Sequence, residues 1–320
     1  MLFRSTLIWG LAFIAQRIGG QYLDAFSFNF LRNVVATIFI LLLMFIKYLI
    51  NKNKPQNNKQ ELNICKNNNY KKNLLLGGSL IGIALATAMS FQQLGINLEG
   101  AGKSGFITAL YIVFVPVIGL LFGRKIKPLI LIALVLALTG LYLINVNSEG
   151  FSFSKGTIYL FLCALCYSAQ IMLIDKFSKG VDVIQLSCVE FGVATIVLLP
   201  FALIKGSMNI ESIVKAIPAI LFLGVFSSGI AYTLQIYAQT EVNVNIACII
   251  MSLESLFSLI FGMIILSEKH GVIQLIGCLC ILLAVILSQL DFKNKKGGRS
   301  GLRKRSSNRD HHGCQRERLR

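Results

Sequence analysis

The sequence predicts an all-α membrane protein with ten transmembrane helices, arranged as two inverted five-helix repeats. Hydrophobic residues make up 55% of the 320-residue chain and charged residues only 14%, against roughly 25% charged residues in soluble domains. The hydrophobic residues form runs of about 17–25 residues, the length that crosses a hydrocarbon core of roughly 30 Å. Matching patterns recur in the two halves, and five runs per half require opposite orientations in the membrane.

The apolar runs are expected to be helical because a helix satisfies its own backbone hydrogen bonds inside lipid. They are Leu2–Ile18, Ala25–Ile50, Leu74–Ile96, Ala101–Phe122, Pro128–Asn145, Lys155–Ile174, Val183–Ile204, Lys215–Ala238, Val242–Leu266 and Val272–Leu290. The connections are short except for the Lys- and Asn-rich segment 51–73, whose low apolar content predicts a loosely held or disordered loop. The first run continues into Gln16 and Arg17 without a small-residue cleavage site, which favours a membrane span over a signal peptide.

Basic residues are distributed unevenly among the connections. If the amino terminus is cytoplasmic, the cytoplasmic connections contain Lys52, Lys54, Lys59, Lys66, Lys71, Lys72, Arg124, Lys125, Lys127, Lys176 and Lys179, besides a basic tail. The outer connections contain Lys155, Lys205 and Lys269, with Asp24, Glu99, Glu149 and Glu211. Because positive charge is typical of cytoplasmic loops, we predict cytoplasmic termini and a multi-pass location in the plasma (inner) membrane.

The chain divides into two repeats and a tail. Residues 1–147, with the cytoplasmic loop 51–73, are expected to form the first repeat, residues 148–291 the second, and residues 292–320 a basic, disordered tail. An offset of 158 residues pairs Val35–Ile38 with Val193–Ile196, Trp9 with Tyr167, Asp24 with Asp182, and Arg32 with Glu190. A smaller offset pairs Gly82 with Gly224 and Gln93 with Gln235. Inverted repeats of this kind are the architecture of alternating-access carriers.

The run Ala101–Pro116 and its counterpart Asn243–Leu256 occupy matching places in the two halves. The first begins with small residues and Lys103 and is interrupted by Tyr111 and Pro116, which a helix tolerates inside a bilayer when neighbouring helices compensate. Leu110-Tyr111 falls opposite Leu253-Glu254. Polar side chains that face each other at mid-membrane from two related halves predict a translocation site.

Three charged residues lie inside apolar spans: Arg32, Glu190 and Glu254. A charge there costs a few kcal/mol, so each is expected to face protein or water and to have a partner. Arg32 and Glu190 occupy matching positions and could pair with each other. Glu254 lies on a polar stripe with serine residues, which predicts an interior position. A buried carboxyl group could carry protons during exchange; a structural ion pair, a helix–helix hydrogen bond or snorkelling to a headgroup would explain the same residues.

Amide and aromatic residues in the spans predict a cavity for a polar solute, because amide and phenol groups recognise such molecules without a buried charge. These candidates are Trp9, Gln92, Gln93, Tyr111, Tyr167, Tyr232 and Gln235. Lys103, at the start of the fourth span, could bind an anionic solute group. Packing or interfacial anchoring explains individual aromatic residues equally well, and Lys103 could simply reach the outer headgroups.

The composition argues against several other classes of protein. Much of the net charge of +17 lies in the loop and the tail rather than on a folded face with aromatic residues, so we expect no nucleic acid partner. The eight cysteines include pairs at Cys163/Cys166 and Cys278/Cys280, but they lack the additional Cys or His ligands of a metal site. The three histidines lie at a span end and in the tail, so no catalytic constellation is visible. We therefore expect neither an enzyme nor a cofactor.

At this level the chain resembles the EamA-type transporters of the drug/metabolite transporter superfamily, over roughly Leu7 to Leu290. The resemblance is carried by Trp9-Gly10, Phe30-Leu31-Arg32, Ala101–Thr108, Leu253-Glu254 and Ser267-Glu268, in this order in a ten-span layout. The chain departs from the family at Ser255, where proline usually follows the glutamate, and at Tyr167-Ser168, which replaces Trp-Gly in the second repeat.

The resemblance implies a permease for small metabolites such as amino acids. Together with the inverted repeat it predicts alternating access around a cavity formed by the first, third, fourth, sixth, eighth and ninth spans, with proton coupling through a carboxyl group. Two alternatives stay open: an uncoupled facilitator of the same fold, and a membrane scaffold or sensor that does not transport. The expected partners are a small-molecule solute, the lipid bilayer and protons, and the sequence does not specify an oligomeric state.

Overall fold

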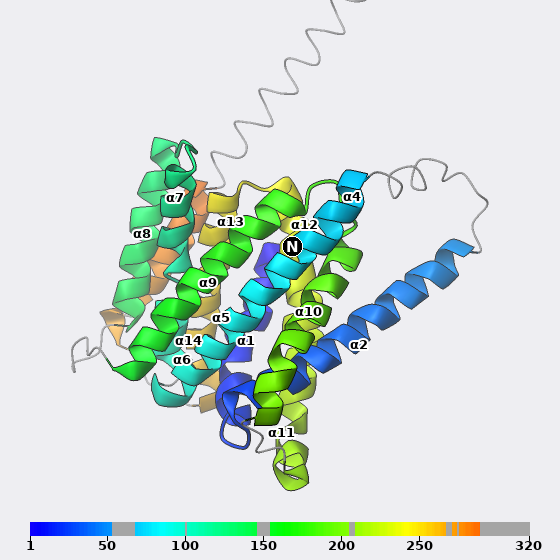
Figure 1. Cartoon of the computed structure of the whole chain (residues 1–320). Helices are drawn as coiled ribbons and strands as arrows, with labels where there is room; N and C mark the ends of the chain where they lie inside the picture. Colours follow the sequence, from blue (N-terminus) through cyan, green and yellow to red (C-terminus); the bar gives the residue numbers. More distant parts are fainter. Residues whose placement is uncertain are drawn as a thin grey trace, which may run out of the picture.

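The structure is a computed structural model that describes residues 1–52, 68–99, 101–145, 154–204, 209–266, 271–273 and 275–288 of the chain. These residues form helices and short connections, with no strand among them (Figure 1). Most of the loop 51–73, the boundary between residues 147 and 148, and the tail 292–320 lie outside the described residues.

The first half contains eight labelled helical segments among the described residues. They are α1 (Leu2–Gly19), α2 (Ala25–Lys52), α4 (Asn68–Lys72), the π-helix η1 (Asn73–Gly77), α5 (Gly78–Glu99), α6 (Ala101–Thr108), α7 (Tyr111–Leu121) and α8 (Pro128–Asn145). The second half contains α9 (Lys155–Phe177), α10 (Val183–Ile204), α11 (Ile210–Phe222), the π-helix η2 (Leu223–Tyr232), α12 (Thr233–Glu241), α13 (Val244–Met251) and α14 (Leu253–Leu266). A further apolar helix covers Leu275–Ser288.

Seven helical stretches in the described part are long and apolar enough to cross a membrane. They are Ala25–Ile50, Tyr70–Glu99, Ser104–Leu121, Lys155–Phe177, Val183–Ile204, Ile210–Glu241 and Val244–Ile265. Helix α1 and the shorter apolar helices Pro128–Leu143 and Leu275–Ser288 match the remaining expected spans. Large apolar side chains such as Leu121, Phe122 and Ile204 are highly exposed, as a lipid-facing surface requires. The prediction of an all-α membrane protein is confirmed.

Helix starts follow from capping residues. Asp24 Oδ1 accepts hydrogen bonds from the backbone N–H groups of Phe26 (2.9 Å) and Ser27 (3.1 Å) at the start of α2. Asp182 Oδ1 accepts one from Gln185 (3.1 Å) at the start of α10. These bonds satisfy donors that lack an intrahelical partner. An aspartate therefore caps both α2 and α10, and these two aspartates are paired by the offset of 158 residues between the repeats.

The fourth and ninth expected spans are both broken in the middle. Helix α6 ends at Thr108 and α7 begins at Tyr111, while α13 ends at Met251 and α14 begins at Leu253. Pro116 lies inside α7, past the first break. The ninth span therefore breaks although Ser255 stands where proline was expected. Breaks inside the membrane are tolerated where the irregular backbone is surrounded by protein or lines a cavity.

The two π-helical segments, η1 and η2, lie in the third and eighth spans. A π-helix contains an additional residue per turn and often marks a functional position. Helix η2 passes close to α2: a methyl group added at Gly224 would lie 2.5 Å from Val35 Cγ1 and 2.9 Å from the backbone oxygen of Arg32. The absence of a side chain at Gly224 therefore allows this approach.

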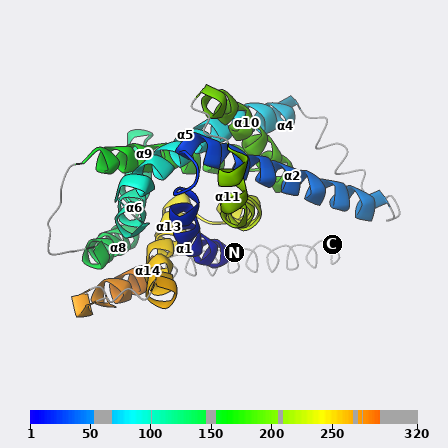
Figure 2. The same ribbon diagram turned by 90° about the horizontal axis from the view of Figure 1, so that it is seen from below.

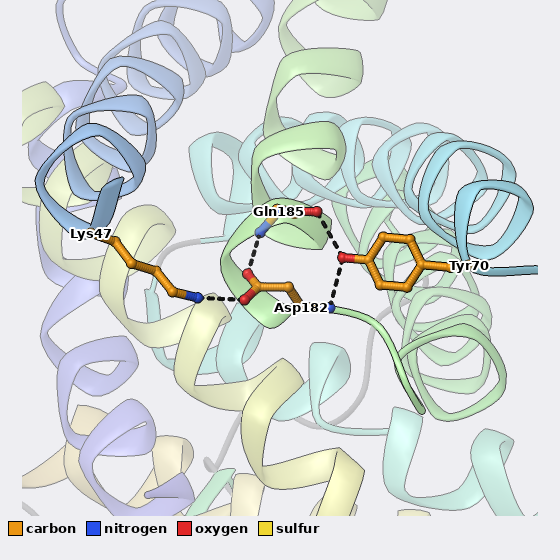
Figure 3. Close-up of polar contacts among 4 residues, drawn as sticks. All are labelled: Lys47, Tyr70, Asp182 and Gln185. Atoms are coloured by element: carbon orange, nitrogen blue, oxygen red, sulfur yellow. Dashed lines mark hydrogen bonds and ion pairs between the residues drawn. The ribbon is translucent and has the colours of Figure 1, made fainter. Parts of the chain in front are cut away.

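The C-terminal part of α2 extends away from the other helices (Figures 1 and 2), and Leu41, Leu42 and Phe45 on it are exposed. Near its end, a polar cluster joins α2 to α4 and α10 (Figure 3). Lys47 Nζ lies 2.5 Å from Asp182 Oδ2, and the Tyr70 hydroxyl donates to Gln185 Oε1 at 2.7 Å. This cluster connects helices from the two halves at one end of the molecule.

Candidate solute site

A cavity with an empty volume of about 460 Å³ lies between the helices of the two halves. The six spans that were expected to surround a cavity all line it, through residues on α1, α5, α6, α7, α9, η2, α12, α13 and α14. Helix α2 also contributes Arg32. The predicted site residues that line it are Trp9, Arg32, Gln92, Tyr111, Tyr167, Tyr232, Gln235 and Glu254. The cavity therefore brings together polar side chains that are far apart in the sequence.

Tyr111 and Glu254 meet across this cavity. The Tyr111 hydroxyl donates a hydrogen bond to Glu254 Oε1 at 3.0 Å, and both side chains are buried. Tyr111 is the first residue of α7, and Glu254 lies in the first turn of α14. The break in the ninth span therefore places the carboxyl group beside the unpaired backbone N–H groups at the start of a helix.

A chain of hydrogen bonds crosses another part of the cavity. The Tyr232 hydroxyl donates to the Tyr167 hydroxyl at 3.0 Å, and the Tyr167 hydroxyl donates to Gln92 Oε1 at 3.2 Å. The Trp9 ring lies edge-on to Tyr232, with a centroid distance of 5.0 Å. These hydrogen bonds link η2, α9 and α5, and they orient the polar groups of Tyr232, Tyr167 and Gln92.

Arg32 lies in α2 and is almost completely buried, at 1% exposure. Its Nε and Nη2 atoms donate to the Ser228 hydroxyl at 3.3 and 3.2 Å. Ser228 belongs to η2, the π-helix that the close contact at Gly224 brings against α2. The guanidinium group is therefore held in position by a neutral hydroxyl group.

The expected pair of Arg32 and Glu190 does not form in the structure. No ion pair joins them within the described part of the chain. Glu190 is fully buried behind the cavity wall, where its Oε1 accepts a hydrogen bond from Gln170 Nε2 at 2.9 Å. Its Oε2 has no hydrogen-bond partner. Glu190 therefore contacts the cavity only through Gln170, which lines it.

Two other predicted residues are not placed on the cavity wall. Gln93 is buried beside it, and its Nε2 donates to the Gln16 backbone oxygen at 3.1 Å and to Asn97 Oδ1 at 2.9 Å. The side chain of Lys103 lies outside the described residues, although its backbone is part of α6. In the described part of the chain, no group of three His, Cys, Asp or Glu residues could hold a metal ion.

The structure adds polar lining residues that the sequence interpretation missed: Gln16, Thr108, Gln170 and Ser227. Gln170 is an amide inside an apolar span, the same signal that identified Gln92, and could have been found in this way. Gln16 lies near the end of the first expected span, Leu2–Ile18, and was not singled out there; on α1 its side chain lines the cavity. Thr108 and Ser227 are too common in membrane helices to stand out in a sequence.

Comparison with known proteins agrees with this arrangement. The sequence model of the EamA-like transporter family matches residues 1–146 and 154–290. An uncharacterized transporter of Archaeoglobus fulgidus is 29% identical over 287 residues, which cover 89% of this chain and 83% of that protein. The uncharacterized transporter YoaV of Bacillus subtilis is 22% identical and covers 91% of this chain and 96% of its own. A crystal structure with 16% identity has the same fold, with a TM-score of 0.69 over 90% of this chain and 95% of that one.

Proposed function

The chain belongs to the EamA-like transporter family and is a multi-pass membrane transporter of small molecules, and we propose that it carries amino acids or similar metabolites by alternating access. The observation that carries this proposal is the polar cavity between the two halves, in which Tyr111 donates to Glu254 beside two broken helices. Broken helices around a binding site near the bilayer midplane are typical of carriers that alternate between two openings.

Alternating access would follow from an inverted repeat of residues 1–147 and 148–291. Reciprocal contacts support this arrangement. A methyl group at Gly224 would meet the backbone oxygen of Arg32, and one at the matching Gly82 would meet the backbone oxygen of Glu190, the residue that matches Arg32. Such an exchange of equivalent contacts is what a two-fold relationship between the halves produces. The two halves would rock about this close-packed region and expose the cavity to either side.

The positions of the basic residues support an orientation with both termini in the cytoplasm of the plasma membrane. In this orientation the Lys47–Asp182 pair lies at the cytoplasmic end of α2 and α10. A second pair lies at the same end: Arg124 Nη1 is 2.6 Å from Asp175 Oδ2 and joins the end of α7 to α9. Both pairs connect residues of the first repeat to residues of the second.

Glu254 is the residue that we propose for proton coupling. It lines the cavity and accepts a hydrogen bond from the neutral Tyr111 hydroxyl, and no described Lys or Arg forms an ion pair with it. A carboxyl group that lines a water-filled cavity can take up a proton from it and release the proton again. Glu190, which is buried and reaches the cavity through Gln170, is the second candidate.

The test uses the full-length protein in proteoliposomes with a panel of radiolabelled amino acids, nucleosides and sugars. We expect exchange of at least one panel member across the membrane, and net flux that an imposed pH gradient drives. Glu254→Gln keeps an acceptor for Tyr111 but removes the titratable group, so it should retain exchange and lose the response to pH. Glu211→Gln, at an exposed carboxylate paired with Lys215 on α11, is the matched control and should change neither.

Three outcomes decide between the possibilities. Flux that ignores the pH gradient in the wild type, and is unchanged in Glu190→Gln and Glu254→Gln, would identify an uncoupled facilitator and contradict proton coupling. Coupled flux that survives Glu254→Gln but not Glu190→Gln would move the coupling role to Glu190. The absence of flux for every member of the panel would contradict the proposed transport of amino acids and related metabolites.

A further inference from the structure

Arg32 brings an unneutralised positive charge to the cavity. Within the described residues its guanidinium group donates to the Ser228 hydroxyl alone, and its Nη1 atom has no hydrogen-bond partner there. No described carboxylate lies within ion-pair distance of it. A buried guanidinium group without an acidic partner is costly in a membrane protein, which makes a missing anion the simplest explanation for its presence.

The nearby carboxyl groups are bound elsewhere. Glu254 Oε1 accepts from Tyr111, and Glu190 Oε1 accepts from Gln170. Arg32, Glu190 and Glu254 all lie near enough to the Tyr232 hydroxyl to interact with it electrostatically. The three charged groups therefore lie in one region, and no ion pair joins them in the described part of the chain.

A second donor without an acceptor lies in the same cavity. The indole Nε1 of Trp9 is buried and has no hydrogen-bond partner in the part of the chain that the structure describes, although buried tryptophan N–H groups usually have one. Both Trp9 and Arg32 line the cavity, from α1 and α2 respectively. The first two helices therefore each contribute a donor that the protein itself leaves unsatisfied.

We propose that the transported solute carries a carboxylate group that Arg32 and Trp9 bind. This inference rests on the proposed transport function and narrows its substrates to carboxylate-bearing solutes. The Nη1 atom of Arg32 and Nε1 of Trp9 supply N–H donors to the carboxylate oxygens, and the charge of the arginine strengthens the bond. Because both donor atoms are buried, the side chains around them must shift slightly when the solute enters, as alternating access requires.

The remaining lining residues indicate which other chemical groups the solute carries. The side-chain oxygens of Gln16, Gln170 and Gln235 are buried without a donor, so they can accept hydrogen bonds from an amino or hydroxyl group. Phe13 and Ile171 supply apolar surface. A single guanidinium group can balance one negative charge, which favours a monoanion over a phosphate dianion.

The test measures binding of matched acids and amides to the purified full-length protein in detergent. The probes are L-leucine, L-phenylalanine, L-threonine and lactate, each beside its carboxamide, with inorganic phosphate and O-phosphoserine as the dianion arm. Thermal stabilisation gives an apparent Kd for each. Loss of a charge-assisted hydrogen bond corresponds to about tenfold or more in affinity, so we expect at least one acid to bind about tenfold more tightly than its amide.

Variants test which side chains recognise the carboxylate. Arg32→Gln should bind the acid and its amide equally, and Trp9→Phe should weaken binding of the acid by about two- to tenfold, as expected for one neutral hydrogen bond. Arg124→Gln makes the same substitution at an exposed arginine away from the cavity and should keep the preference for acids. If Arg32→Gln fails to fold, the affinity of Trp9→Phe and the acid–amide comparison in the wild type test whether the site recognises a carboxylate.

The results separate this inference from the proposed function. Equal binding of acids and amides in the wild type, binding of phosphate in preference to carboxylates, an intact preference in Arg32→Gln, or no binding of any carboxylate would each overturn the inference. If proteoliposomes exchange only panel members that lack a carboxylate, the nucleosides or sugars, transport of small metabolites stands while the carboxylate inference fails. If no member of the panel is exchanged, both fail.

Discussion

The side-chain hydroxyl groups of Thr37 and Thr195 lie 3.2 Å apart where α2 packs against α10. The two residues occupy the same position in the repeated Val-Ala-Thr-Ile sequence. Each hydroxyl also lies 2.8 Å from the backbone oxygen four residues earlier, on Asn33 or Phe191. Because each hydroxyl has one proton, one threonine donates to its backbone oxygen while the other donates to its partner threonine. Contact between equivalent residues is expected where a two-fold axis passes between two helices, which supports the proposed inverted repeat.

This contact predicts an energetic coupling between the two threonines. Thr37→Val and Thr195→Val keep the shape of the side chain and remove its hydroxyl group. In a double-mutant cycle based on unfolding in detergent, we expect a coupling of about 0.6 kcal/mol, the average for such bonds between membrane helices. Thr139→Val, at an exposed threonine that bonds only to its own helix at Val135, is the control and should not couple to either. Additive effects of Thr37→Val and Thr195→Val would contradict a direct bond.

The glycine contacts predict a matched pair of destabilising variants. At Gly224 an added methyl group would lie 2.5 Å from Val35, and at Gly82 it would collide with the backbone oxygen of Glu190. Because backbone atoms cannot move aside easily, Gly82→Ala and Gly224→Ala should each lower the free energy of unfolding by about 1–3 kcal/mol. Thermal or denaturant unfolding in detergent measures the change.

Gly192 provides the control on α10 itself. No atom lies within 4 Å of a methyl group added there, and alanine is the better helix former. Gly192→Ala should therefore leave the protein as stable as the wild type or slightly more stable. Equal destabilisation by Gly82→Ala and Gly192→Ala would contradict close packing between the halves as the cause.

Removal of the Tyr111 hydroxyl should impair transport more than folding. Tyr111→Phe leaves Glu254 Oε1 without its donor at 3.0 Å. Loss of one hydrogen bond should cost about 0.5–1.5 kcal/mol of stability, and the altered position of the carboxyl group should reduce flux in proteoliposomes. Tyr142→Phe, at an exposed tyrosine on α8, should change neither quantity. Wild-type flux in Tyr111→Phe would mean that the bond to Glu254 has no part in transport.

The cluster in Figure 3 contains both an ion pair and a helix cap, and their contributions to stability can be measured separately. Lys47 and Asp182 are 47% and 29% exposed, so their pair should contribute less than about 1 kcal/mol. Lys47→Gln and Asp182→Asn should have similar small effects that disappear at high salt. Asp182→Ala also removes the acceptor of the Gln185 N–H, which should cost about 1 kcal/mol more at any salt concentration. A salt-sensitive loss of the same size in all three variants would contradict the capping role.

Most of the polar residues that line the cavity could be predicted, because a polar group in an apolar span is energetically costly and therefore informative. This signal identified Arg32, Gln92 and Glu254, all of which line the cavity. It could not distinguish Gln93 from Gln92, since neighbouring residues on a helix point about 100° apart and only packing decides which one faces the cavity. It also could not show that Arg32 contacts Ser228 rather than Glu190, because partners on different helices depend on how the helices cross.

The sequence by itself determined that the chain is a helical membrane protein and which polar groups its spans contain, because the cost of exposed backbone and charge in lipid leaves few other structures. Its matching positions also placed Tyr111 opposite Glu254. Only the tertiary structure decided that helices break next to these two residues, that α2 contributes Arg32 to the cavity, and that Glu190 lies behind it. These features depend on the contact of η2 with α2 and of α5 with α10, where glycines let backbones approach, and such contacts between distant segments leave no periodic pattern in the chain.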